Sequence, residues 1–186
     1  MWVIAVVVPV LLFLIFLLLY NSLVARKNRV EQAAGGIDAQ LKKRYDLIPN
    51  LVAAVKGYVE HERGTLEELT QIRTKALGGG LTPAEKADLD AKVTSALRQV
   101  MIAVEAYPQL QAATTFVQLQ RSLNEVEEQL SASRRHYNAA VTDYNNGLEM
   151  MPSSLIAKML GYQRKDVLVI PESERQNVDV GKLLRG

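Results

Sequence analysis

The chain opens with a nearly uninterrupted apolar run. Residues 2–20 read WVIAVVVPVLLFLIFLLLY, in which Pro9 is the one helix-breaking residue. As a helix this run is about 28 Å long, close to the roughly 30 Å hydrocarbon core of a bilayer. Trp2 and Tyr20 stand at its two ends, where aromatic side chains favour the membrane interface. The run therefore predicts a single transmembrane helix within an anchor of residues 1–25.

The residues around the anchor predict how it sits in the membrane. No basic residue precedes the apolar run, and the run is longer than the core of a secretory signal peptide, so we expect an uncleaved anchor. Arg26, Lys27 and Arg29 follow directly. Because lysine and arginine remain on the cytoplasmic side, they predict an N-terminus outside and a cytoplasmic remainder. With Trp2 and Tyr20, these three residues are the predicted membrane-interface residues.

Beyond the anchor, apolar residues recur at spacings of three, four and seven. One such series from Ile37 to Ala76 predicts a long helix. Gly35-Gly36 and Pro49 are its weak points, and the hydrogen bond lost at Pro49 should kink it. Gly78-Gly79-Gly80 should end it.

Two further helices follow from local signals. Thr82-Pro83-Ala84-Glu85 predicts a capping box with proline at the first helical position. The last long helix is expected from about Gln109 to about Gly147, where apolar residues keep one strict register over four heptads. Pro152 should stop it, before a short helix over residues 154–160 that Gly161 closes.

These amphipathic helices must bury their apolar stripes against one another. We therefore predict an all-α fold, in which a single N-terminal transmembrane helix precedes a long antiparallel three- or four-helix bundle in residues 26–161. A turn at Tyr107-Pro108 gives four helices if Pro49 also divides the first helix, whereas a bend there gives a long two-arm hairpin. Residues 162–186 form the predicted C-terminal tail. Its stretch 167–170 could pair as a strand or dock in a groove, but Pro171 and the charged remainder favour a loose tail.

Composition removes several classes of function. All 22 basic and 20 acidic residues come after Ala25, the net charge is +2, and there is no cysteine. The charge does not indicate nucleic-acid binding, and disulfides and zinc–thiolate sites are excluded. His61-Glu62 lacks the second histidine of a zinc protease motif, and the three glycines lack the lysine of a phosphate loop. The sequence thus predicts no enzyme, no catalytic residue, no metal, no cofactor and no small-molecule substrate.

One polar constellation remains. Asp46 and Asn50 flank Pro49 one helical turn apart, while Tyr137-Asn138 and Tyr144-Asn145 stand one heptad apart. We expect Asp46 to pair with Arg134 or Asn138 across the bundle, as a structural clasp or as a docking surface. The candidate structural or interaction residues are Asp46, Pro49, Asn50, His61, Glu62, Arg134, Tyr137, Asn138, Tyr144 and Asn145.

Several stretches carry a family resemblance. They are RYDLIPNLV (44–52), VKGYVEHE (55–62), EAYPQLQA (105–112), FVQLQ (116–120), RRHYNAAVTDYN (134–145) and PSSLIAKMLGY (152–162). With them the chain resembles the LemA family of bacterial membrane proteins. The resemblance implies a single-pass protein of the bacterial inner membrane, with a short exterior N-terminus, a cytoplasmic helical bundle and no known enzymatic activity. One class of the family is implicated in forming magnetosome membranes, and family genes often lie near those of membrane metalloproteases. After Gly161 this chain departs from the family pattern.

Anchor, heptads and resemblance together predict a non-enzymatic scaffold. It would sit in the lipid bilayer and self-assemble as a homo-oligomer on the cytoplasmic face, because confinement to a membrane raises the effective concentration of weakly associating helices. The alternative is an adaptor or regulator of another membrane protein, such as a membrane metalloprotease or a transporter.

Overall fold

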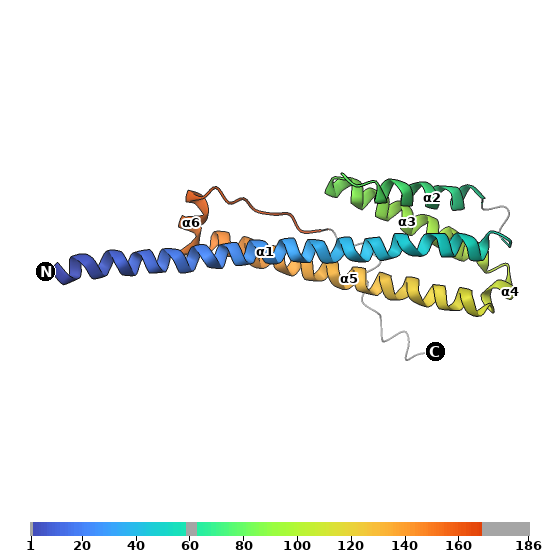
Figure 1. Ribbon diagram of the computed structural model, residues 1–186, viewed down its shortest axis with the longest axis horizontal. Coiled ribbons are helices and arrows are strands. Elements are labelled where there is room, and N and C mark those ends of the chain that lie inside the picture. The colour runs from blue at the N-terminus through green and yellow to red at the C-terminus, as the bar shows by residue number, and fades with distance from the viewer. Residues whose placement is uncertain (1, 59–62, 169–186) are drawn as a thin grey trace, which may run out of the picture. The chain divides into compact units, whose positions relative to one another are not determined.

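The computed structural model describes residues 2–58 and 63–168, which are mostly helical and contain no strand. Their helices, in chain order, are α1 (Trp2–Val55), α2 (Arg63–Leu77), α3 (Pro83–Val104), α4 (Pro108–Gln111), α5 (Thr114–Glu149) and α6 (Ser153–Met159) (Figure 1). The first part of α1 is apolar and long enough to cross a membrane. The all-α prediction, with one N-terminal apolar helix and a helical remainder, is confirmed.

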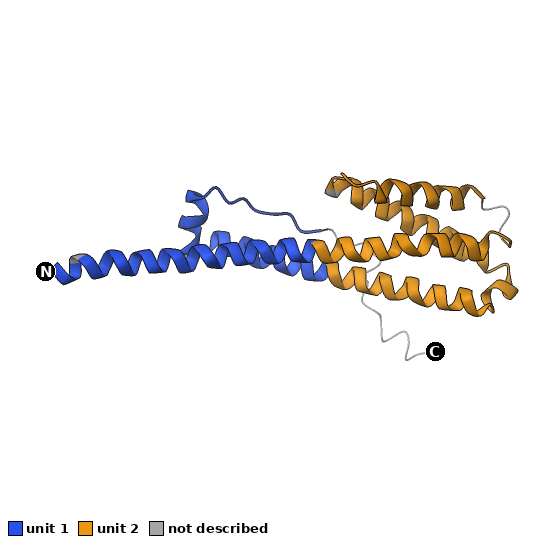
Figure 2. Ribbon diagram, viewed as in Figure 1, with its two compact units in different colours: residues 1–34, 134–186 blue, residues 35–133 orange. Residues whose placement is uncertain are grey.

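The chain forms two compact units (Figure 2). Unit 1 comprises residues 1–34 and 134–186, and unit 2 comprises residues 35–133. Helices α1 and α5 each contribute residues to both units. The boundaries predicted after Ala25 and Gly161 follow the sequence pattern rather than these units, and they stay predictions.

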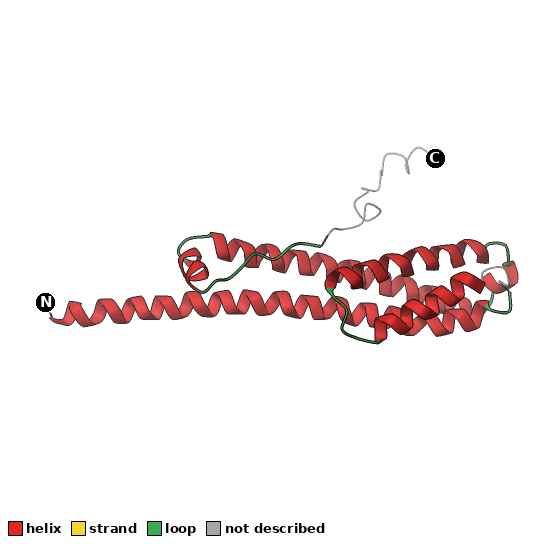
Figure 3. Cartoon of the chain, turned by 90° about the horizontal axis from the view of Figure 1, so that it is seen from above, coloured by secondary structure: helices red, strands yellow, loops and turns green. Residues whose placement is uncertain are grey.

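Unit 2 is a bundle of four helical segments. The second part of α1, then α2, α3 and the first part of α5 run alternately in opposite directions (Figures 1 and 3). Each buries one apolar stripe in a shared core, represented by Leu51, Leu69, Val93 and Leu119. This arrangement satisfies the rule that an amphipathic helix needs partners for its stripe.

The two proline steps behave differently from each other. At Tyr107-Pro108 the chain turns, because α3 ends at Val104 and the short α4 leads into α5. Pro49 does not divide α1, which continues to Val55. The bundle nevertheless has four helical segments, because the chain reverses after Val55 instead.

The single helix predicted from Ile37 to Ala76 is therefore wrong. Helix α1 ends at Val55, where Tyr58 N–H donates to the Val55 carbonyl at 2.9 Å, and α2 starts at Arg63. Gly57 falls in this connection, and glycine is a poor helix former. Val55 and Leu66 are buried in the same core on either side of the turn. Apolar periodicity persists across a turn when both helices face one core, so it could not reveal this break.

The signals between α2 and α3 are confirmed. Helix α2 ends at Leu77, and Gly79 and Gly80 follow with φ of +75° and +73°, values that favour glycine. Thr82 is the N-cap of α3: its Oγ1 accepts from Glu85 N–H at 3.3 Å, and Glu85 Oε2 accepts from Thr82 N–H at 2.8 Å. The Thr82 hydroxyl also donates to Oε2 of Glu85 at 2.8 Å, and the two hydrogen bonds that the carboxylate accepts from Thr82 lower the pKa of Glu85. Both partners of a capping box are thus present.

Unit 1 is built from the first part of α1, the last part of α5, and α6. Their buried residues form a second apolar cluster that includes Leu23, Val30, Val141 and Ile156. The predicted short helix is α6, and Gly161 follows it with φ of +68°.

Candidate functional site

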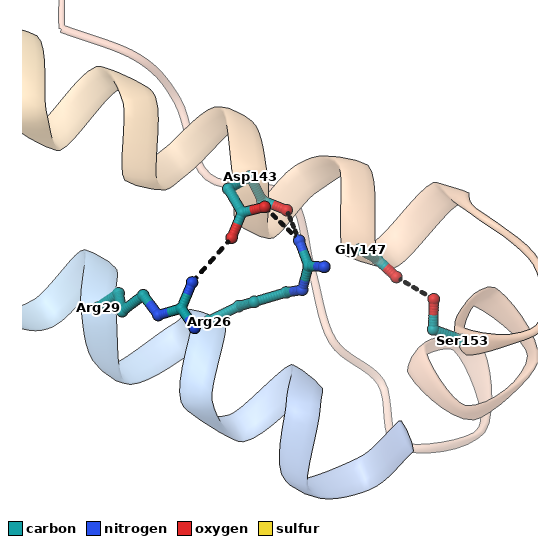
Figure 4. Close-up of polar contacts among 5 residues, drawn as sticks. All are labelled: Arg26, Arg29, Asp143, Gly147 and Ser153. Carbon is teal, nitrogen blue, oxygen red and sulfur yellow. Dashed lines mark hydrogen bonds and ion pairs between the residues drawn. The ribbon is translucent and has the colours of Figure 1, made fainter. Parts of the chain in front are cut away.

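Arg26 joins α1 to α5 inside unit 1. Its Nη1 donates to the backbone carbonyl of Asp143 at 2.8 Å and also to the Asp143 carboxylate. Arg29 places its Nη1 3.5 Å from the other carboxylate oxygen of Asp143 (Figure 4). Because all three side chains are partly exposed, the net stabilisation is modest. The contact with the main chain nonetheless fixes which residues of α1 and α5 face each other.

Gly147 allows α1 side chains to approach α5 closely. A Cβ at this position would lie 2.9 Å from Cδ of Arg26 and 3.5 Å from Cδ2 of Leu23. Near the end of α5, Ser153 Oγ of α6 donates to the Gly147 carbonyl at 2.7 Å (Figure 4). It also lies 2.8 Å from the Met150 carbonyl. The bond to Gly147 adds a side-chain donor in the last turn of α5, where carbonyls lack the partners of a continuing helix. These contacts hold α6 folded back against α5.

Two asparagines of α5 hold the segment that follows α6. Asn145 Nδ2 donates to the Lys165 carbonyl at 2.9 Å, and its Oδ1 accepts from Lys165 N–H at 3.0 Å. Asn138 repeats this pattern with Leu168, at 2.9 and 2.7 Å. In each pair a side-chain amide makes the two bonds that a neighbouring β-strand would make. We name Asn138 and Asn145 the clamp, and residues 163–168 the strap.

The spacing of the clamp matches the spacing of the strap. Seven residues of helix separate Asn138 from Asn145, or about 10.5 Å of α5. Three residues separate Lys165 from Leu168, and an extended chain covers about 10 Å in three residues. The heptad spacing of the asparagines therefore fits an extended segment at every third residue.

Further contacts hold the strap near Tyr144. Tyr144 is buried, and its hydroxyl donates to the Gln163 carbonyl at 3.1 Å. Burial raises the pKa of Tyr144, and nearby Tyr162 adds to the effect. The Lys165 ammonium lies 6.0 Å from the Tyr144 ring centroid, within cation–π range. Arg164 forms an ion pair with Glu149. The expected loose tail is therefore wrong for residues 162–168, while the rest of the tail lies outside the described residues.

Unit 2 contains a buried ionic cluster. The Arg44 side chain is 5% exposed, and its Nη1 lies 2.7 Å from Oδ1 of Asp90, itself 12% exposed. Its Nη2 lies 2.9 Å from Oε2 of Glu127. Burial and the charge of Asp90 raise the pKa of the adjacent Tyr45. The guanidinium thus joins three helices of the bundle through charge-assisted hydrogen bonds.

The residues flanking Pro49 lie on an exposed face. Asp46 accepts a hydrogen bond from Lys42 at 2.7 Å, one turn earlier on α1. Asn138 instead bonds to the main chain of Leu168 in the strap. The contacts of Asp46 with Lys42 and of Asn138 with Leu168 thus stand in place of the expected Asp46–Asn138 pair. The pairing of Asp46 with Arg134 stays a prediction. Pro49 and Asn50 are exposed on α1.

The other predicted residues fall into three groups. Tyr137 is half-buried against the apolar cluster of unit 1. His61 and Glu62 lie outside the described residues. Of the predicted membrane-interface residues, Trp2 is 85% exposed and the Tyr20 ring stacks on that of Phe16. Nζ of Lys27 lies 3.9 Å from Oε1 of Glu31, and Arg26 and Arg29 form ion pairs with Asp143.

Sequence reasoning missed both ionic contacts. The sequence predicts Arg26 as a membrane-interface residue that orients the anchor, and it gives no partner for Asp143. A signal was available. Arg26 comes near the start of the first bundle helix and Asp143 near the end of the last, and in antiparallel helices such positions lie next to each other. No comparable signal existed for Arg44 and Asp90, which are 46 positions apart. In the described ranges 2–58 and 63–168, no group of three or more metal-ligating side chains is placed to hold an ion.

The apolar start of α1 and the helical bundle indicate a membrane-associated helical protein, with one candidate membrane-spanning helix among the residues that the structure describes. The chain belongs to the LemA family, which it matches over residues 33–181. The match continues past Gly161, where the motifs indicated a departure. Among relatives, Protein LemA of Metamycoplasma hominis is 25% identical over 163 residues, covering 88% of this chain and 74% of that protein.

Two magnetosome proteins are also similar. Magnetosome protein MamQ 2 of Paramagnetospirillum magneticum is 25% identical, covering 86% of this chain and 68% of that protein. Magnetosome protein MamQ of Magnetospirillum gryphiswaldense is 22% identical, covering 80% of this chain and 64% of that protein. None of these names designates an enzyme.

Proposed function

We propose that this chain is a non-enzymatic scaffold that self-assembles on the cytoplasmic face of the bacterial inner membrane. The observation that carries the proposal is the clamp on α5. Its four hydrogen bonds with the strap all involve main-chain atoms of Lys165 and Leu168. Such a clamp accepts the same segment from the same chain or from a second copy.

The strap is suited to such exchange. It follows Gly161, whose positive φ marks a sharp change in chain direction, and the side chains of Gln163, Arg164, Asp166 and Val167 are exposed. Releasing it breaks a set of main-chain hydrogen bonds, each contributing about 0.5–1.5 kcal/mol. Exchange of an identical element between protomers is a low-cost route to oligomers. Anchoring all copies in one membrane raises their effective concentration.

Helix α1 supports a structural role. It runs without a break from the apolar anchor into the core of unit 2, where Leu51 and Val55 are fully buried. Two relatives are named as proteins of the magnetosome, a name for a component rather than for a reaction. The basic residues Arg26, Lys27 and Arg29 after the anchor favour a cytoplasmic bundle.

Two full-length variants test the exchange. Asn138→Ala/Asn145→Ala removes the clamp but keeps the strap. Lys165→Pro/Leu168→Pro keeps the clamp but removes the two N–H donors that it accepts from, because proline has no N–H. The control is Val167→Pro, which places proline in the strap at an N–H outside the clamp.

Differently tagged copies are co-expressed and one tag is pulled down from detergent-solubilised membranes. We expect wild type and the control to capture their other-tagged copies, and each double variant to capture itself much less. The clamp variant and the strap variant should capture each other, since together they supply one intact contact. If each double variant associates with itself like wild type, the clamp is not an assembly contact.

The adaptor alternative gives a different result in the same membranes. A photo-crosslinking residue at the exposed position Asp166 should then capture one other membrane protein, such as a metalloprotease or a transporter. The scaffold proposal requires capture of a second copy of this chain instead.

A further inference from the structure

Unit 1 exposes a second apolar surface, which no other residue in the described ranges 2–58 and 63–168 buries. The corner between α5 and α6 exposes five large apolar side chains within residues 150–160. They are Met150 (63% exposed), Met151 (69%), Leu155 (61%), Met159 (68%) and Leu160 (43%). We name these five residues the corner patch. Surface patches of this kind mark contacts with proteins or membranes.

Helix α6 displays the corner patch because its other face is already packed. Ile156 and Ala157 are buried in the apolar cluster of unit 1, together with Leu23 of α1. Phe16 and Leu19 pack against the same cluster. Helix α6 therefore lies beside residues 16–23 of α1. Figures 1 and 3 show α6 next to the N-terminal half of α1.

The length needed to cross a bilayer indicates that the part of α1 beside α6 still lies in the membrane. Along α1, the large apolar side chains described from Trp2 to Ile15 are all exposed, and partial burial starts at Phe16. Fourteen helical residues cover only about 21 Å, whereas a bilayer core of about 30 Å takes about 20 residues. If the core starts at Trp2, it reaches about Asn21. Any tilt of the helix moves this limit further along α1.

The bilayer therefore extends to the part of α1 that α6 covers. We propose that the corner patch inserts into the interface of the leaflet through which α1 leaves the membrane. The occupant of this face is lipid, because α6 packs through its other face on the cluster that Phe16 and Leu19 of the anchor join, which puts the corner patch at the depth of the last turns of the anchor. Interfacial helices bury their apolar face about 5–10 Å into the boundary between head groups and acyl chains.

The charges around the patch fit this position. Lys158 is exposed in the last turn of α6, and its long side chain reaches head groups while its stem stays in apolar surroundings. Arg26 and Arg29 follow Asn21 by one to two turns, and Asp143 partly neutralises both. The α5–α6 corner thus gives the protein a second membrane contact beside its anchor.

Single cysteines test the insertion, because the chain has no native cysteine. Full-length Leu155→Cys and Met159→Cys proteins are labelled with an environment-sensitive fluorophore and reconstituted into vesicles of phosphatidylcholine and phosphatidylglycerol. Leu18→Cys in the anchor is the reference for a label inside the bilayer. Thr142→Cys, exposed on α5 about 12 Å before Met150, is the matched control.

We expect the labels at 155 and 159 to show blue-shifted emission and quenching by lipids brominated near the head group. The label at 18 should be quenched by lipids brominated deeper, and the label at 142 by neither. Aqueous emission at 155 and 159 overturns the proposal. Blue-shifted emission without bromolipid quenching, or disulfide crosslinks between copies, also overturns it and places a second copy on the patch.

A charged variant separates insertion from folding. With the label at Met151→Cys, Leu155→Asp/Met159→Asp should lose both the blue shift and the quenching, while its helical circular dichroism stays that of the parent. The substituted side chains are exposed, so the fold does not depend on them. Unchanged quenching in this variant also contradicts insertion.

Discussion

The buried ionic cluster of unit 2 gives the sharpest stability prediction. Arg44→Met keeps most of the apolar stem of the side chain and removes its charge. Asp90 is then left as a carboxylate whose side chain is only 12% exposed. Removing one partner of a buried ion pair costs about 3–5 kcal/mol, because the other charge stays in a poorly hydrated site after losing the guanidinium that neutralised it. For a chain of this size, that corresponds to a Tm lower by about 6–20 °C.

Glu127 should contribute little to this cost. Its side chain is 43% exposed, so water can hydrate it once Arg44 is gone. The decisive comparison is the double variant Arg44→Met/Asp90→Leu, which removes both buried charges. Replacing a buried ion pair by apolar residues is often neutral or stabilising. We therefore expect the double variant to lie within about 1 kcal/mol of wild type, even though the single variant is strongly destabilised.

The assay is thermal and urea unfolding of the full chain in detergent micelles, followed by circular dichroism at 222 nm. Lys42→Met is the control, because it removes an exposed ion pair with Asp46 from the same stretch of α1 and should cost less than about 1 kcal/mol. If the double variant is as unstable as Arg44→Met, the cost does not come from the charge of the Asp90 carboxylate after its ion pair with Arg44 is lost. The packing of the Arg44 stem would then be the cause.

Three further predictions follow from local geometry. Gly147→Ala should not give the usual helix stabilisation of about 1 kcal/mol, because the new Cβ meets Arg26; in an Arg26→Ala background it should give that stabilisation. Both are measured by thermal unfolding, and equal effects in the two backgrounds would contradict the close contact. Because the hydrogen bonds from Thr82 lower the pKa of Glu85, its carboxylate stabilises the fold above the ordinary pKa of about 4.5 and this contribution is lost as the pH falls. Glu85→Gln should therefore lose less Tm than wild type between pH 7 and pH 3, and parallel losses would refute the linkage. A cysteine at Gly186 should be shielded from impermeant thiol reagents in intact cells, and rapid labelling there would reverse the assigned orientation.

Some elements could be predicted from the sequence because their determinants are local. The anchor depends on a continuous run, the start of α3 on four adjacent residues, and the end of α2 on three glycines. The reversal after Val55 could not, because two antiparallel helices that face one core keep the same apolar spacing. Only Gly57 marked the turn, and a lone glycine within a helical pattern is weak evidence of a break.

The clamp shows a different limit. The heptad-spaced asparagines were visible in the sequence, but their partner was sought on another helix. Their bonds go instead to the main chain of Lys165 and Leu168, and main-chain atoms leave no side-chain pattern to detect. The sequence alone does show that the seven helical residues from Asn138 to Asn145 are about as long as three residues of extended chain. It predicts an extended partner only once a helical partner is no longer assumed.

The two units are held together by different interactions, and this difference indicates which unit can exchange contacts with another copy. Unit 2 combines a shared apolar core with an ion pair whose Arg44 side chain is 5% exposed, so any opening leaves buried groups uncompensated. The strap of unit 1 depends on hydrogen bonds to its main chain, and its release hydrates those groups at modest cost. A segment of another copy can replace the strap bond for bond, whereas nothing external replaces the buried charges of unit 2. Exchange of contacts is therefore expected in unit 1, close to the membrane that keeps the copies together.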